Sequence, residues 1–392
     1  MLKHIEKFID LSSASGLLLI FMLIAALILA NSPLSHFYQH FQDLPIQFRV
    51  GAVDFHKPLI LWVNEGLMAI FFMALALEMK REFCDGELSK PSQLTLPLLG
   101  AAGGIIFPIA IFLFFTHHNP EKLIGWPIPS TTDIAFAMGV LSLLGKRVPR
   151  SLRVFLVTLS IVDDIAVITI IAIVYSGALS FQLLSLACIG VLCLVILNLL
   201  QVQRIAVYML IGLFIWGCVL KSGVHATLGG IIVGLAIPNR SKKNPEISPL
   251  HLLEEKLYPW VAFFILPLFV LLNGGISLYD VTFSQLTSPL TLGIALGLFL
   301  GKTFGVFLIV FCVVKLGFAK LPKKAKLYDM LAISALTGIG FTMSLFIGAL
   351  AYQGTEFENI ARLGVLLGSA CSALLGCGLF LMKNRLLWKS SK

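Results

Sequence analysis

The chain has 392 residues, of which 58% are hydrophobic and only 12% are charged, and its formal net charge is +9. Soluble domains carry about 25% charged residues, whereas here apolar stretches of about 20 residues, long enough to cross a bilayer as a helix, recur along the chain. The composition excludes a soluble protein and predicts an all-α protein that crosses a membrane many times. The alternating pattern of about ten residues that is typical of a membrane β-barrel is not seen.

The chain begins with a charged, amphipathic segment, MLKHIEKFIDL. We expect residues 1–11 to lie on the membrane surface, since the apolar stretch that follows lacks the small-residue cleavage site of a signal peptide. The whole of 1–392 is expected to form one integral membrane domain. The seven cysteines lie mostly in apolar stretches without a Cys-x-x-Cys motif, which predicts free, packed thiols and neither a disulfide framework nor a metal centre.

The apolar stretches predict twelve membrane-spanning helices. They cover residues 12–30, 59–82, 95–116, 121–143, 151–175, 181–200, 205–219, 223–237, 255–274, 289–314, 328–350 and 358–382. With the N-terminus inside, 23 Lys and Arg residues fall on the cytoplasmic side, five fall outside and one lies within a span, which accounts for all 29. The positive-inside rule predicts both termini in the cytoplasm, so the net charge is a topology signal and does not indicate nucleic acid as a partner.

The first external loop contains IQFRVGAVDFHK, in which polarity alternates around a Gly-Ala pair. This pattern predicts a small external β-hairpin over residues 45–58. The hairpin is suited to a homodimer contact, and an ordered loop without a partner is an equally good interpretation.

The cytoplasmic end of the second span reads LEMKREF and carries charged residues on one helix face. Glu78, Arg81 and Glu82 are spaced i, i+3 and i+4, and Glu254 and Glu255 begin the ninth span on the same side of the membrane. Interfacial anchoring through local salt bridges explains them most simply. The alternative is an acidic cytoplasmic vestibule that gathers cations and responds to pH.

Two spans are interrupted. The fourth begins GWPIPSTTDIAFAMGVL, where the prolines cannot continue a helix, and the eleventh reads LTGIGFTMSLFIG, with two glycines in mid-span. A kinked helix and a glycine-rich packing helix would each explain one interruption. Interruptions at matching positions of two halves instead indicate a transporter built from inverted repeats, here spans 3–5 and 10–12, with its site where the two breaks cross.

Four ionisable residues lie deep in apolar surroundings: Asp133, Asp163, Asp164 and Lys302. Such residues are functional hypotheses by default, because burying charge in a membrane is costly. A neutral ion pair that only holds spans together would leave two of the three acids without a basic partner.

Asp163 and Asp164 are adjacent, and neighbours on a helix point about 100° apart. We therefore expect one to face the broken fourth span and Asp133, and the other to face the tenth span and Lys302. Two carboxylates in one desolvated site repel each other, and carboxylate, Thr hydroxyl and freed carbonyl oxygens suit a small hard cation such as Na⁺. The pattern predicts a site that holds either protons or a cation, and hence cation/proton exchange.

The chain resembles the NhaA family of bacterial Na⁺/H⁺ antiporters from about residue 12 to 385. The resemblance rests on NEGLMAIFF, LEMKRE, WPIPSTTDIAFAMGVL, IVDDIAVI, LKSGVHATLGGIIVG, PWVAFFILPLF, GKTFGV and GIGFTMSLFI. It implies a twelve-span fold with inverted repeats, spans 4 and 11 crossing as extended chains, in the bacterial inner membrane. It further implies electrogenic exchange of about two protons for each Na⁺ or Li⁺, control of internal pH and sodium, no cofactor, and a homodimer formed through the external hairpin.

The resemblance also assigns roles to residues. Asp163 and Asp164 are the essential carboxylates, Asp164 and Thr132 lie near the bound cation, Asp133 compensates dipoles at the crossing, and Lys302 pairs with Asp163 or with the crossing. Glu78, Arg81, Glu82, Glu254 and His225 match positions implicated in the pH response.

Three residues depart from the family pattern. Glu255 and Tyr258 stand where some members have histidines, and Glu65 stands where an aspartate is common. These changes leave the transport chemistry in place and leave the pH at which exchange begins undetermined.

Other functions fit less well. A proton-coupled transporter of another small solute, such as an organic anion, requires a basic or roomy polar site, whereas the charged residues deep in the apolar stretches are mainly acidic. An intramembrane aspartyl protease would lack its Gly-x-Gly-Asp setting and would leave Lys302 without a role. A passive cation channel is the third alternative.

Overall fold

The computed structural model describes residues 2–50, 53–86, 91–175, 180–239, 248–279 and 281–389. The chain divides into two compact units. The first contains residues 1–31, 90–168 and 274–392, and the second contains residues 32–89 and 169–273. Each is described by itself, and the single antiporter domain expected over 1–392 stays a prediction.

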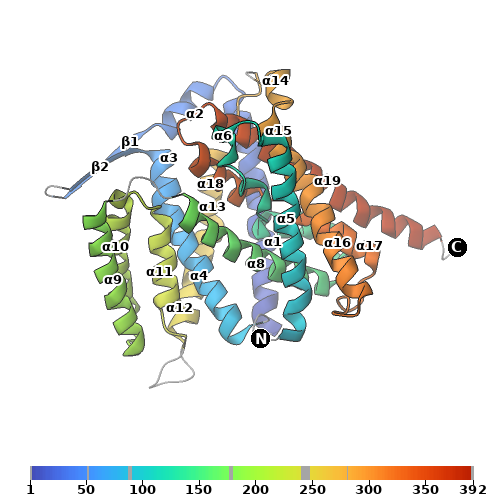
Figure 1. The fold of residues 1–392 in the computed structure, drawn as a ribbon, viewed down its shortest axis with the longest axis horizontal. Coiled ribbons are helices and arrows are strands. Elements are labelled where there is room, and N and C mark those ends of the chain that lie inside the picture. The colour runs from blue at the N-terminus through green and yellow to red at the C-terminus, as the bar shows by residue number, and fades with distance from the viewer. Residues whose placement is uncertain are drawn as a thin grey trace. The chain divides into compact units, whose positions relative to one another are not determined.

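The first unit is helical (Figure 1). Its helices are α1 (Leu2–Ala30), α5 (Pro91–Thr116), α6 (Pro120–Leu123), α7 (Ile134–Leu144), α8 (Arg150–Val174, to residue 168 in this unit), α14 (Phe283–Leu286), α15 (Pro289–Leu296), α16 (Lys302–Lys315), α17 (Leu327–Thr337), α18 (Phe341–Tyr352) and α19 (Phe357–Lys389). Glycines let α5 and α16 pack closely, because a Cβ at Gly103 would lie 2.3 Å from the carbonyl oxygen of Gly305. Small residues play this part where membrane helices meet.

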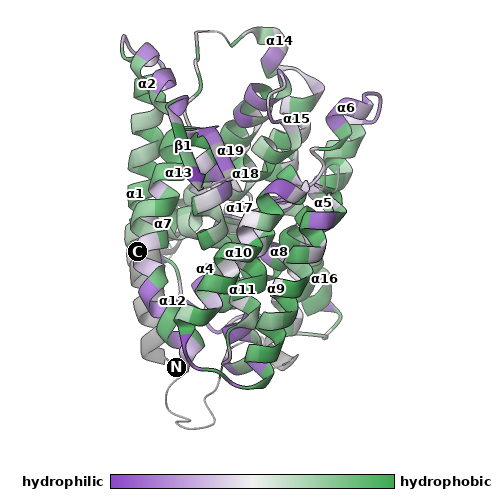
Figure 2. Cartoon of the chain, turned by 90° about the vertical axis from the view of Figure 1, so that its left-hand side faces the viewer, coloured by the Kyte–Doolittle hydropathy of each residue, from purple (hydrophilic) through white to green (hydrophobic). Residues whose placement is uncertain are grey.

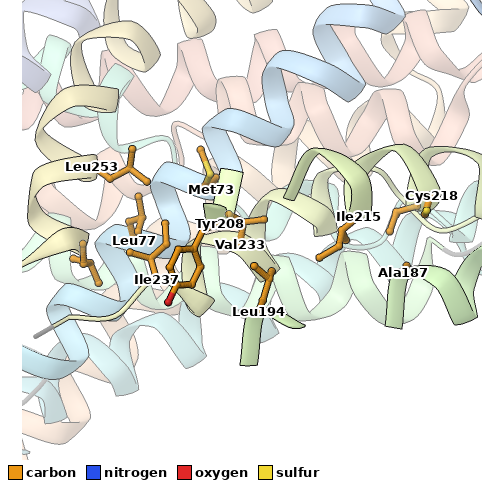
Figure 3. Close-up of a cluster of buried hydrophobic side chains, with 12 residues drawn as sticks. Met73, Leu77, Ala187, Leu194, Tyr208, Ile215, Cys218, Val233, Ile237 and Leu253 are labelled. Carbon is orange, nitrogen blue, oxygen red and sulfur yellow. The ribbon is translucent and has the colours of Figure 1, made fainter. Parts of the chain in front are cut away.

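The second unit combines helices with a hairpin. Its elements are α2 (Ser35–Gln42), β1 (Pro45–Val50), β2 (Val53–Pro58), α3 (Leu59–Trp62), α4 (Met68–Asp85), α9 (Phe181–Leu199), α10 (Ile205–Ser222), α11 (Thr227–Ala236), α12 (Pro249–Trp260) and α13 (Leu266–Asn273). Figure 3 shows a cluster of buried side chains from α4, α9, α10, α11 and α12 and the residues that flank them, with Tyr208 and Ile215 among them. The core of this unit therefore lies among these five helices.

The predicted hairpin is confirmed. Strands β1 and β2 pair antiparallel, with Pro45 opposite Pro58 and Val50 opposite Val53. The Gly-Ala turn at residues 51–52 lies outside the described residues. Trp62 Nε1 donates a hydrogen bond of 3.1 Å to the carbonyl of Ile46, which ties the hairpin to the helix that follows it. A homodimer contact through the hairpin stays a prediction.

The described residues contain nine helices that are long and apolar enough to cross a membrane. Two bent pairs also qualify, Ala14–Ala30 with Ser35–Gln42 and Pro120–Ser130 with Ile134–Leu144, and Thr227–Ala236 is a shorter apolar helix. Figure 2 shows hydrophobic residues along most of the long helices, with hydrophilic residues gathered at helix ends and in α2, α6 and α14. A multi-pass helical membrane protein is therefore confirmed, and each predicted span overlaps one of these segments.

The N-terminal segment belongs to a longer helix than expected. Residues 2–11 and the first predicted span form one helix, α1, without a break at residue 11. Side chains before Ala14 are not described, so the surface location of residues 1–11 stays a prediction.

Candidate functional site

The fourth predicted span is broken where the sequence indicates. A short 3₁₀ turn at Ile128–Ser130 and the helix α7 are separated by residues 131–133, and the two parts bend by 46°. Pro127 and Pro129 prevent the α-helix from continuing. Asp133 then caps α7, because its Oδ1 accepts a hydrogen bond of 2.9 Å from the backbone N–H of Phe136.

The eleventh span is broken between α17 and α18, at residues 338–340. The two breaks cross and bond to each other. The backbone N–H of Asp133 donates to the carbonyl of Ile339 at 2.6 Å, and Thr132 Oγ1 reaches the carbonyl of Thr337 at 2.9 Å. Close packing requires the glycine at position 338, since a Cβ there would lie 2.3 Å from the carbonyl oxygen of Leu298.

Asp133 joins the starts of two half-helices. Besides capping α7, its Oδ2 accepts hydrogen bonds from the backbone N–H of Thr342 at 2.9 Å and from Thr342 Oγ1 at 2.6 Å, at the start of α18. Helix N-termini carry partial positive charge and free N–H groups. A single buried carboxylate therefore accepts hydrogen bonds at the starts of two half-helices, and its dipole-compensating role stays a prediction.

Asp163 and Lys302 form a fully buried ion pair. Lys302 Nζ lies 2.5 Å from Asp163 Oδ2, and both side chains are 0% exposed. Lys302 begins α16 directly after a π-helical turn at Gly297–Gly301, and such turns are common at functional sites. Lys302 therefore contacts both of the partners expected for it, Asp163 and, through Thr132, the crossing.

Thr132 completes a triangle with this pair. Its Oγ1 lies 2.9 Å from Lys302 Nζ, 2.7 Å from Asp163 Oδ2 and 2.9 Å from the carbonyl oxygen of Thr337. A hydroxyl has one proton to donate. When Thr132 Oγ1 accepts a hydrogen bond from Lys302, it can donate its own proton either to the Asp163 carboxylate or to the carbonyl of Thr337. A change in the charge of the ion pair can therefore change the hydrogen bond to the broken eleventh span.

Asp163 lies between two of the predicted spans. It contacts the fourth span, through Thr132, and the tenth, through Lys302. Asp164 is buried with 4% exposure, and its charge also acts on Lys302. The separate roles expected for the two neighbours stay a prediction.

One oxygen of the ion pair is unsatisfied. Asp163 Oδ1 is buried and accepts no hydrogen bond from the described residues. Nearly all buried polar atoms in proteins have a partner, so an exception calls for an explanation. An oxygen of this kind is open to a proton or to a small cation.

The acidic residues predicted to lie at the cytoplasmic side are brought together in the second unit. Arg81 reaches Glu82 at 2.8 Å and Glu254 at 2.7 Å, through different guanidinium nitrogens. Glu78 is close enough to interact electrostatically with Arg81 and Glu254, and its buried Oε1 accepts no hydrogen bond from a described residue. Glu255 acts on Glu254 through its charge. The sequence spacing predicts the shared face of Glu78, Arg81 and Glu82, and the fold adds the contact between Arg81 and Glu254.

His225 lies elsewhere in the second unit, in the connection between α10 and α11. Its Nδ1 is 2.8 Å from Thr227 Oγ1. Burial, helped by the charge of Lys57, lowers the pKa of His225 to about 4. The imidazole is therefore neutral at ordinary pH, and its pH-linked role stays a prediction. Glu65 is paired with Lys57.

Sequence reasoning missed two groups of buried polar residues. Thr342 and Ser344 bond across the crossing, to Asp133 and to the carbonyl of Ile128 respectively. Asn64 and Asn273 exchange amide hydrogen bonds of 3.2 and 2.9 Å in the second unit. Hydroxyl and amide residues in apolar stretches were the available signal, but their partners lie more than 200 residues away in the chain.

The sequence matches known proteins over a range that includes both the Asp163–Lys302 pair and the cluster around Arg81. A family model described as Na⁺/H⁺ antiporter 1 matches residues 6–380. A protein of Pseudomonas putida strain GB-1 is 50% identical over 381 residues, which is 97% of each chain, and one of Pseudomonas fluorescens strain Pf0-1 is 52% identical over 372 residues, 94% of each. One of Aeromonas salmonicida strain A449 is 49% identical over 373 residues, 95% of this chain and 94% of the relative. Each is named Na(+)/H(+) antiporter NhaA.

Proposed function

The chain belongs to the NhaA family of Na⁺/H⁺ antiporters, and from this premise we propose that it exports Na⁺ or Li⁺ in exchange for protons at Asp163 and Asp164. The observation that carries the proposal is the unsatisfied Oδ1 of Asp163 beside the buried Asp163–Lys302 pair. It supports binding of either a proton or a cation at one place. Similarity to transporters also favours transport over an enzymatic reaction.

The charges of the buried groups support competition. Asp133, Asp163 and Asp164 are three buried carboxylates near the single buried ammonium of Lys302, and the charges of both Asp163 and Asp164 act on Lys302. A proton on Asp164 balances the site without a cation. When Na⁺ arrives, that proton leaves, and a second leaves from the Asp163–Lys302 pair as the carboxylate turns toward the cation.

This exchange moves net charge. One Na⁺ carries one positive charge and about two protons carry two, so each cycle is electrogenic and a proton gradient or membrane potential can drive it. Asp164 and Thr132, with the carboxylate of Asp163, supply the oxygen atoms that a hard cation prefers. The transported ions are substrates, and we propose no resident cofactor.

We place the site midway across a twelve-span protein with both termini in the cytoplasm and the inner membrane as its location. The nine candidate spans, Ala14–Ala30, the bent pair Pro120–Ser130 with Ile134–Leu144 and the short helix Thr227–Ala236 together make twelve. The breaks in spans 4 and 11 fall in the second helix of 3–5 and of 10–12, as inverted repeats require. Alternating exposure of a site between such repeats transports the ion.

The cluster of Glu78, Arg81, Glu82 and Glu254 is proposed as the cytoplasmic pH-responsive group, with His225 as a further pH-linked position. Support comes from the three glutamates that share the single guanidinium of Arg81. Na⁺/H⁺ exchange controlled by this cluster would regulate internal pH and sodium.

A homodimer through the β1–β2 hairpin is the proposed assembly in the lipid bilayer.

Purified protein in sealed vesicles tests the function. An imposed Na⁺ gradient should drive proton movement, followed with a dye that reports internal pH, and Asp164→Asn should abolish it. Glu358→Gln is a matched control, because Glu358 is an acid that pairs with Arg362 on α19, outside the crossing. Absence of proton movement in the unaltered protein, or full movement in Asp164→Asn, would contradict the proposal.

A further inference from the structure

A pair of histidines on α2 is not used by the transport site. His36 and His40 are both exposed and lie four residues apart, so they share one face of the helix. Their ring centroids are 6.2 Å apart and their planes are tilted by 48°. Imidazoles at this helical spacing are the arrangement in which two side chains can bind one metal ion.

The helix that carries them is firmly anchored on its other face. Tyr38 is buried, and its hydroxyl donates to the carbonyl of Leu271 at 2.6 Å. Gln42 Nε2 donates to the carbonyl of Leu272 at 2.6 Å. Because position 38 points about 200° away from position 36, these contacts hold α2 while leaving the histidine face exposed.

The hydrogen bond of one ring fixes which nitrogen is available. His40 Nδ1 lies 2.8 Å from the carbonyl oxygen of His36. A carbonyl only accepts, so Nδ1 of His40 carries the proton and Nε2 keeps its lone pair. The second ring N–H of a metal-binding histidine usually donates a hydrogen bond in this way, which orients the ring and makes it a better ligand.

The separation of the rings agrees with a shared ion. Two nitrogen–metal bonds of about 2.0–2.1 Å, with about 1.2 Å from each nitrogen to its ring centroid, span at most about 6.5 Å. The observed 6.2 Å lies within that reach. A tetrahedral or square arrangement requires centroids about 5 Å apart, so binding requires the exposed His36 ring to turn toward His40.

We propose that His36 and His40 form a site for a divalent transition-metal ion such as Cu²⁺, Ni²⁺ or Zn²⁺, with water completing the coordination. Imidazole nitrogen suits these ions and does not suit Na⁺. No group of three or more His, Cys, Asp and Glu side chains in the described parts of the chain is arranged to hold a metal, so the site is a two-residue chelate of modest affinity. On the proposed topology it faces the outside of the cell.

The site has consequences that do not depend on transport. A bound ion links two successive turns of α2, so it stabilises the segment that Tyr38 and Gln42 hold. Since a metal binds the deprotonated imidazole, binding weakens as pH falls. Affinity should follow the order of divalent ions, with Cu²⁺ above Ni²⁺ and Zn²⁺.

Titration of the full-length protein with Cu²⁺ tests this site. The protein is purified in detergent without an oligohistidine tag, and electron paramagnetic resonance counts the nitrogens bound to the ion. We expect a signal from two imidazole nitrogens on one Cu²⁺. The affinity for Cu²⁺ should fall at least about tenfold in each of the single variants His36→Gln and His40→Gln. Both side chains are exposed, so neither change should alter the melting temperature of the metal-free protein.

The variant His117→Gln/His118→Gln is the matched control. It removes two neighbouring histidines with ring centroids 3.7 Å apart, near the end of α5. The proposal holds if this variant keeps the two-nitrogen signal and the α2 variants lose it. It fails if His36→Gln/His40→Gln binds Cu²⁺ with unchanged affinity and nitrogen number, or if the control variant loses the signal instead.

Discussion

The two clusters of buried acids are each built around one basic residue, but the bases differ. In the first unit Lys302 pairs with Asp163, and neither side chain is exposed. In the second unit Arg81 holds Glu82 and Glu254, and the three side chains remain 12–23% exposed. Arginine stays charged in proteins, whereas a buried lysine can lose its proton. On the proposed function, the first cluster therefore exchanges protons, and the second keeps a fixed positive charge beside its acids.

Neutralising one acid in each cluster should give the largest contrast. Asp163→Asn removes the negative charge that pairs with Lys302 and that is proposed to bind Na⁺, so Na⁺-driven proton movement in vesicles should fall at least about 100-fold. Glu254→Gln leaves Arg81 its bond to Glu82, so the maximal rate should stay within about threefold and only its pH dependence should shift.

Rates and pH profiles of both variants are measured in the same vesicles. Equal losses of maximal rate in Asp163→Asn and Glu254→Gln would remove the distinction between an exchanging cluster and a regulatory one. A pH profile unchanged by Glu254→Gln would argue against a pH-responsive role for the second cluster.

Stability should separate Lys302 from an exposed lysine. Lys302→Ala leaves Asp163 buried without its base, and breaking a buried pair costs about 3–5 kcal/mol, less if the carboxyl takes a proton. Lys323→Ala in an exposed loop should cost almost nothing. Melting temperatures in detergent compare the two, and equal values would count against the pairing.

Thr342 should matter more than a threonine that bonds only within its own helix. Thr342→Val removes the 2.6 Å bond to Asp133 and should cost about 1–2 kcal/mol. Thr158→Val is the control, because Thr158 Oγ1 bonds the carbonyl of Val154 four residues earlier in α8. If Thr158→Val destabilises the protein as much as Thr342→Val, the hydrogen bond between Thr342 and Asp133 contributes no more to stability than a bond within one helix.

The smallest expected effect concerns His225. Its pKa in the folded protein, about 4, lies below the ordinary value of 6.5. The neutral form is favoured by folding, so its stabilising contribution is complete above pH 6.5 and is lost as pH falls toward 4. His225→Gln should therefore lose less thermal stability than the unaltered protein between pH 7 and 5. A steeper loss in the variant would show that the lowered pKa is not the cause.

The sequence is enough to predict the spans and the two breaks, because apolar length and the Pro and Gly positions mark them directly. It also predicts the hairpin and the Glu78–Arg81–Glu82 face, since both depend on local spacing. It does not predict that Asp163 meets both Thr132 and Lys302, or that Thr342 bonds Asp133. Those contacts depend on how the two broken spans cross, and the spacing of residues within one segment does not predict that crossing.

The central claim is that Na⁺ and protons compete for the same buried carboxylates, and Na⁺ affinity as a function of pH tests it most directly. Calorimetric titration of the purified protein with Na⁺, in buffers of different ionisation enthalpy, gives both the affinity and the protons released. The account predicts that affinity falls as pH falls and that between one and about two protons leave for each Na⁺ bound. Binding of unchanged affinity across the pH range, with no proton released, would contradict it.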